Sequence, residues 1–70
     1  MEQLKSISAL RAGTYILLNE TTYRVQHVYA MQGLAELFEL STSFPLIIHQ
    51  REFKNKIYQL SKEHNPEYFL

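Results

Sequence analysis

The stretch from Tyr15 to Ala30 constrains the fold most, because it contains two strand-like segments separated by a tight turn. Tyr15–Leu18 is a short apolar run between turn residues, a pattern typical of a buried strand. Thr22–Ala30 is rich in β-branched and aromatic residues, which favour strands. Asn19-Glu20-Thr21 is a polar break of hairpin length, and asparagine adopts left-handed backbone conformations more readily than most residues. The sequence therefore predicts a β-hairpin here.

Residues in the second strand of this hairpin alternate between two faces. One face is the more apolar, and we expect it to pack against the core; it carries Tyr23, Val25, His27 and Tyr29. On this interpretation, His27 is a partly buried, hydrogen-bonded histidine.

Two further strands are predicted after the Met31-Gln32-Gly33 turn. Leu34–Leu40 alternates like a strand, although Leu34, Leu37 and Phe38 also approximate helical spacing; its shortness and its flanking turns favour the strand. Phe44–His49 follows the Ser41-Thr42-Ser43 loop. Because Pro45 cannot donate a ladder hydrogen bond, it should lie at the start of this strand or on an edge.

Residues 50–62 admit two interpretations. Phe53, Ile57 and Leu60 follow helical spacing. Alternatively, a short helical turn at Arg51–Asn55 precedes a fifth strand at Ile57–Leu60, and we favour this second interpretation.

The length of 70 residues corresponds to one domain, with an irregular lead-in at 1–9, a barrel at 10–60 and a tail at 61–70. The chain has no cysteine and no apolar run long enough for a signal peptide or a membrane helix. These features predict a cytoplasmic protein that does not enter a membrane.

The number of short strands predicts a mainly β fold, a small barrel of four to five strands with a short helical turn near the C-terminus. One segment begins with Leu10-Arg11-Ala12-Gly13 and continues with an apolar strand, a turn and Tyr23-Arg24-Val25. This order of features resembles the opening hairpin of SH3-like barrels of the KOW type. The similarity extends to the first domain of the elongation factor P and initiation factor 5A family. That family carries a functional lysine or arginine at a loop tip after the second strand, whereas no lysine lies between Arg24 and Lys54 here. The resemblance thus implies a fold and counts against that activity.

Catalytic and metal-binding patterns are not found. The spacing of His27, His49 and His64 does not match a ligand pair, and His64 is expected to be solvated. Glu36 and Glu39 fall on opposite sides of a strand. The serines of the 41–43 loop have no base near them in sequence. We therefore predict no enzyme activity, no metal and no cofactor.

Aromatic residues exceed what a core this small can bury, since the chain holds five tyrosines and four phenylalanines. We therefore predict a small accessory or regulatory protein that binds a protein partner, or itself, through exposed apolar surface. Edge pairing through Phe44–His49 or docking of the Tyr68–Leu70 end would be the means. The candidate partner-binding residues are Tyr23, Tyr29, Met31, Phe44, Tyr68 and Phe69.

The alternative is a nucleic-acid- or ribosome-associated barrel, in which basic side chains meet phosphates while Tyr58 stacks on a base. The formal net charge of zero counts against it. Its candidate residues are Arg51, Lys54, Lys56, Tyr58 and Lys62.

Overall fold

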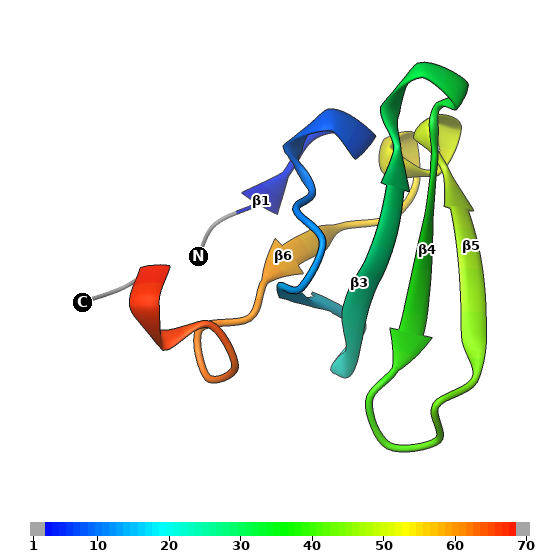
Figure 1. The fold of residues 1–70 in the computed structure, drawn as a ribbon. Coiled ribbons are helices and arrows are strands. Elements are labelled where there is room, and N and C mark those ends of the chain that lie inside the picture. The colour runs from blue at the N-terminus through cyan, green and yellow to red at the C-terminus, as the bar shows by residue number, and fades with distance from the viewer. Residues whose placement is uncertain (1–2, 69–70) are drawn as a thin grey trace.

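A single antiparallel sheet organises residues 3–68, the part of the chain that the computed structural model describes (Figure 1). Its order is β1-β6-β2-β3-β4-β5. The strands are β1 (Gln3–Leu4), β2 (Tyr15–Leu18), β3 (Thr21–Tyr29), β4 (Leu34–Glu39), β5 (Pro45–His49) and β6 (Tyr58–Leu60). Short 3-10 turns are η1 (Ile7–Ala9), η2 (Ala30–Gln32), η3 (Gln50–Lys54) and η4 (Pro66–Tyr68). The predicted mainly β fold is confirmed, with six strands where four to five were predicted.

The first hairpin has the shape that its sequence predicts. Leu18 pairs with Thr21, so the loop between β2 and β3 consists of two residues. Asn19 and Glu20 have φ angles of 51° and 69°. Two positive φ angles define the turn type whose twist matches that of the flanking strands.

The segment that admitted two interpretations forms a turn and a strand. The 3-10 turn η3 is followed by β6, which pairs with both β1 and β2. A continuous helix over these residues is therefore wrong. Tyr58, in β6, is fully buried, so the strand places its largest side chain in the core. The β4 segment is likewise a strand and not a helix.

The N-terminal lead-in is less irregular than predicted, because β1 pairs with β6. Leu4, Ile7 and Leu10 are all buried in the core. The backbone N–H of Ile7 donates to Gln50 Oε1 at 2.9 Å, which ties η1 to η3. Both contacts, β1 with β6 and η1 with η3, join segments far apart in sequence, so the local sequence pattern does not reveal them.

A bulge at Gln26 overturns the predicted alternation along β3. Val25 pairs with Leu37 and His27 pairs with Glu36, so Gln26 is an extra residue in the ladder. Val25 is fully buried as predicted, but His27 and Tyr29, which were expected on the same core-facing side, are exposed. Beyond the bulge, Val28 packs against the core in place of its neighbours.

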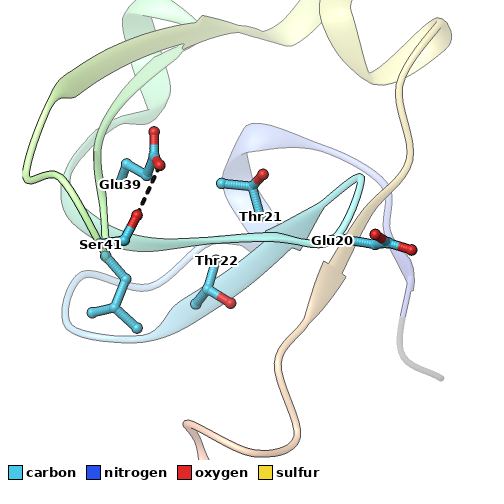
Figure 2. A pocket seen from close by; sticks show the side chains of 6 residues that line it. Glu20, Thr21, Thr22, Glu39 and Ser41 are labelled. Carbon is cyan, nitrogen blue, oxygen red and sulfur yellow. Dashed lines mark hydrogen bonds between the residues drawn. The ribbon is translucent and has the colours of Figure 1, made fainter.

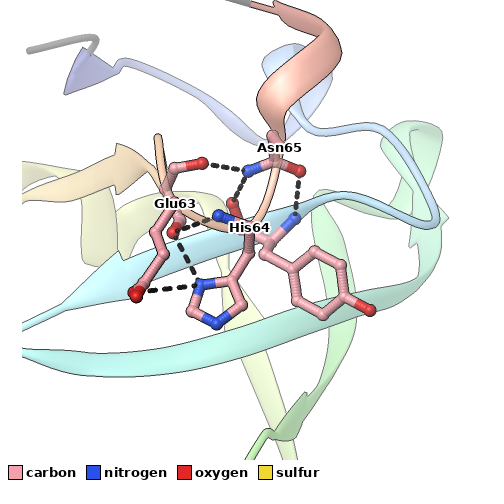
Figure 3. Close-up of polar contacts among 5 residues, drawn as sticks. Glu63, His64 and Asn65 are labelled. Carbon is pink, nitrogen blue, oxygen red and sulfur yellow. Dashed lines mark hydrogen bonds and ion pairs between the residues drawn. The ribbon is translucent and has the colours of Figure 1, made fainter.

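The C-terminal segment is anchored by the side chain of Asn65, which is only 2% exposed. Its Oδ1 accepts from the N–H of Tyr15 at 2.9 Å, and its Nδ2 donates to the Tyr15 carbonyl at 2.7 Å and to the Ser61 carbonyl (Figure 3). His64 is half-buried, with Nδ1 3.1 Å from Ser61 Oγ and its ring 5.5 Å from that of Tyr15. The prediction that His64 is solvated is therefore wrong.

Candidate binding surface

The sheet β3-β4-β5 has one face toward the core and one away from it. Ala35, Leu37 and Ile48 are buried, and they define the inner face. Residues that alternate with these lie on the other side, which we name the outer face. Cross-strand pairing arranges it in three rows: Tyr29–Leu34–His49, His27–Glu36–Ile47 and Arg24–Phe38–Pro45.

Much of the outer face is apolar and open to solvent. Tyr29 is 44% exposed and Ile47 is 46% exposed. Leu34 and Phe38 are half-covered, and Pro45 is exposed. Three adjacent strands thus present neighbouring apolar side chains on a surface that the rest of the described chain does not cover.

Glu36 occupies the central row of the outer face. Its side chain is 29% exposed, and its Oε1 lies 3.9 Å from His27 Nε2. This distance exceeds that of a hydrogen bond. In residues 3–68, no hydrogen-bond donor contacts the Glu36 carboxylate. A partly desolvated acceptor is therefore free to receive a donor from another molecule.

The predicted partner-binding residues do not form one patch. Met31 is 99% exposed in η2, and Phe44 is 70% exposed in the β4–β5 loop. These two connections lie at opposite ends of β4 (Figure 1). Tyr23 is half-buried and packs against the core, so it lies apart from the exposed residues Met31 and Phe44. For Tyr68 only the backbone is described, as part of η4, and Phe69 lies outside the described residues.

Sequence reasoning missed most of the outer face. Glu36 was considered only as a catalytic acid, and Ile47 only as part of an edge strand. The even spacing of Leu34, Glu36 and Phe38 is a signal that these three side chains share a face. Which residues lie beside them on β3 depends on the bulge, for which no local signal was recognised.

The edge of the sheet at β5 follows a regular ladder. The N–H of Glu39 donates to the Phe44 carbonyl at 2.9 Å, and the N–H of Gln50 donates to the Gly33 carbonyl at 2.8 Å. Hydrogen-bonded pairs alternate with non-bonded pairs in an antiparallel ladder. The backbone groups that point to the open edge are therefore those of Pro45, Ile47 and His49.

This edge offers little to an incoming strand. Pro45 lies on an edge strand, as predicted, and has no N–H. The N–H of His49 already donates to Glu52 Oε2 at 2.9 Å. Of the open-edge positions in β5, only Ile47 keeps a free N–H. An added strand would find one donor here, and blocked edges of this kind are a common protection against edge pairing.

Glu52 is held by two hydrogen bonds that link η3 to its surroundings. Lys56 Nζ donates to Glu52 Oε1 at 2.9 Å. Burial on its own would raise the pKa of Glu52, but the hydrogen bonds from Lys56 and from the His49 backbone outweigh burial and lower it. The same hydrogen bond raises the pKa of Lys56. Lys56 is thus engaged with a carboxylate of its own chain.

The basic residues proposed for nucleic-acid binding do not assemble with a stacking ring. Tyr58 is fully buried, and its ring packs against Phe53 at a centroid distance of 4.7 Å. A base cannot stack on it, so that assignment is wrong. Arg51 and Lys54 are exposed in η3, whereas Lys62 lies after β6.

An open groove of about 320 Å³ lies between the β2–β3 turn and the β4–β5 loop (Figure 2). It is lined by Glu20, Thr21, Thr22, Glu39, Leu40 and Ser41. Ser41 Oγ donates to Glu39 Oε2 at 3.0 Å. Glu39 lies on the opposite side of β4 from Glu36, as predicted. The groove and the outer face are therefore separate surfaces.

Within residues 3–68, no three His, Cys, Asp or Glu side chains come close enough together to hold a metal ion. No helix in the same region is long and apolar enough to cross a membrane.

Comparisons with protein-family models, with curated proteins and with solved structures found no match to this chain.

Proposed function

We propose that this protein is a small non-catalytic interaction module that binds another polypeptide through the outer face of β3-β4-β5. The observation that carries the proposal is the exposure of neighbouring apolar side chains across three strands, with Tyr29 and Ile47 each nearly half exposed. Aromatic and aliphatic side chains grouped on a rigid sheet are suited to protein contacts. An accessory or regulatory role in the cytoplasm is part of this proposal.

The backbone groups at the β5 edge support a binding site on the sheet face and not on the edge. Pairing through β5 would need a row of free backbone groups, and Ile47 offers the one free N–H there. A face contact instead uses side chains, which the register already brings side by side. This favours face docking over the edge pairing expected from sequence.

An SH3-like barrel remains our proposal for the fold family. Support comes from connectivity, because β2 to β5 form consecutive hairpins, η3 follows, and β6 returns to pair with β2. The long strand β3 contributes to both halves of the sheet, pairing with β2 at its start and with β4 further along.

Site-specific photo-crosslinking in the native host tests the proposed function. A crosslinking amino acid replaces Ile47 or Tyr29 on the outer face, and in the control it replaces Glu63, whose side chain is 85% exposed on the C-terminal segment. We expect the two outer-face positions to capture one discrete protein and the control to capture none. Equal capture at all three positions, or none at Ile47 and Tyr29, contradicts the proposal.

A further inference from the structure

We infer that the outer face binds a polypeptide segment that presents an arginine between apolar side chains, with the guanidinium on the Glu36 carboxylate. This inference rests on the proposed function and names the chemistry of its partner. Glu36 sits in the centre of the three rows, and its side chain is largely shielded. A charged acceptor inside an apolar surface creates a strong preference for a donor of opposite charge.

The surroundings of Glu36 determine which cation fits. In β4 its neighbours two residues away are Leu34 and Phe38, and across the sheet it faces Ile47 on β5 and the His27 ring on β3. The Glu36–Ile47 pair is a non-hydrogen-bonded one, in which opposed side chains approach most closely. A cation reaching the carboxylate must therefore lie against apolar and aromatic groups.

A guanidinium suits this site better than an ammonium. It is planar, is more weakly hydrated, can lie on an aromatic ring and can donate two parallel hydrogen bonds to one carboxylate. Phe38 and Tyr29 provide rings in the rows on either side of Glu36. The geometry thus favours arginine over lysine in the partner segment.

Other charged or titratable groups on the outer face do not already satisfy Glu36. Arg24 lies in the next row, and its guanidinium is hydrogen-bonded to Gln26 Oε1. His27 approaches no closer than 3.9 Å, and His49 lies in the third row beside Leu34. An incoming arginine would supply the hydrogen bonds that these groups leave unmade.

The same carboxylate disfavours nucleic acid on this face. A phosphate backbone brought onto the outer face would place negative charge beside Glu36. The partner is therefore a polypeptide. The experiment below distinguishes a second copy of this chain from a different protein.

The test uses the complete chain as bait for a displayed library of random short peptides. We expect the enriched peptides to contain arginine flanked by aromatic or aliphatic residues. One enriched peptide is then synthesised with arginine, lysine or glutamine at that position, and its affinity is measured by fluorescence anisotropy. Replacing arginine by glutamine should weaken binding about tenfold or more, and replacing it by lysine should weaken it less.

Two matched variants of the protein locate the contact. Glu36→Gln keeps the side-chain size and should weaken the arginine peptide about tenfold while leaving the glutamine peptide unchanged. Glu39→Gln is the same substitution in the same strand on the opposite side, and it should change neither affinity. Arg24→Gln should leave binding unchanged or strengthen it, because it removes a like charge.

The outcomes separate the inference from the proposed function. Enriched peptides that shift the amide resonances of outer-face residues but lack arginine, and that bind Glu36→Gln equally well, overturn the inference alone. Failure to enrich any peptide, or resonance shifts confined to other surfaces, overturns both. Sedimentation of the protein alone is the remaining check. Self-association that the Glu36→Gln substitution abolishes would identify a second copy of this chain as the partner. Self-association that persists in Glu36→Gln would contradict the assigned role of Glu36.

Discussion

Replacing Tyr58 by phenylalanine should stabilise this protein. The Tyr58 side chain is fully buried, and its hydroxyl has no hydrogen-bond partner within the described chain. Leaving a buried hydroxyl unpaired costs about 1–3 kcal/mol. Phenylalanine keeps the ring contact with Phe53 and removes that cost, so we expect the free energy of unfolding to rise by about 1 kcal/mol. For a domain this small, that corresponds to a rise in Tm of roughly 4–8 °C.

Urea denaturation of Tyr58→Phe and of the unchanged protein measures the effect. Tyr29→Phe is the matched control, since Tyr29 is 44% exposed and its hydroxyl can bond water; its stability should change by less than about 0.5 kcal/mol. A loss of about 1 kcal/mol or more in Tyr58→Phe would refute the reasoning, because it would mean that the hydroxyl is hydrogen-bonded in solution.

The pH dependence provides an independent check on the same side chain. Burial raises the pKa of Tyr58 above its ordinary value of 10.0. The folded state therefore holds this proton more tightly than the unfolded state does. The resulting stabilisation is complete below pH 10.0 and is lost as the pH rises through the folded-state pKa. Tyr58→Phe should show a shallower loss of stability above pH 10.0 than the unchanged protein, measured by the same denaturation series.

Three further substitutions probe the turn, the C-terminal anchor and the η3 carboxylate. Glu20→Gly should raise the free energy of unfolding by about 1 kcal/mol in urea titration, because a φ of 69° costs a residue with a Cβ about that much; no gain would contradict the turn geometry. Asn65→Ala should lower the free energy of unfolding by roughly 2–3 kcal/mol, since two backbone groups of Tyr15 lose their partners. A change below about 0.5 kcal/mol would show that the Asn65–Tyr15 hydrogen bonds are not formed. Glu52 has a lowered pKa, so its stabilisation is present above pH 4.5 and is lost as the pH falls through the lower folded-state value. Glu52→Gln should therefore have a flatter stability profile below pH 4.5 by circular dichroism, and an unchanged profile would mean that the pair with Lys56 is not formed in solution.

Features determined by short-range chemistry were predictable from sequence. The β2–β3 turn follows from a polar break between two strand-like runs, and the confinement of Pro45 to an edge strand follows from its missing N–H. The strand at β4 was correctly preferred over a helix. Each of these depends on residues within a few positions of one another.

Features determined by contacts between distant segments were not predictable. The pairing of β1 with β6 depends on residues more than 50 positions apart, and no local pattern marks Gln3–Leu4 as a strand. Aromatic composition correctly indicates that some rings stay exposed but does not identify them. Tyr58 and Tyr29 both stand in strand-like runs, yet the first is buried by the return of β6 to the sheet and the second lies on the outer face.

The bulge at Gln26 connects the core to the proposed binding surface. With strict alternation, Val25, His27 and Tyr29 would all share one face of β3. The extra residue instead lets Val25 and Val28 pack against the core while His27 and Tyr29 lie on the outer side. One inserted position thus avoids burying a histidine and adds a tyrosine to the exposed apolar surface. The bulge therefore determines which side chains of β3 join the outer face and which pack against the core beneath it.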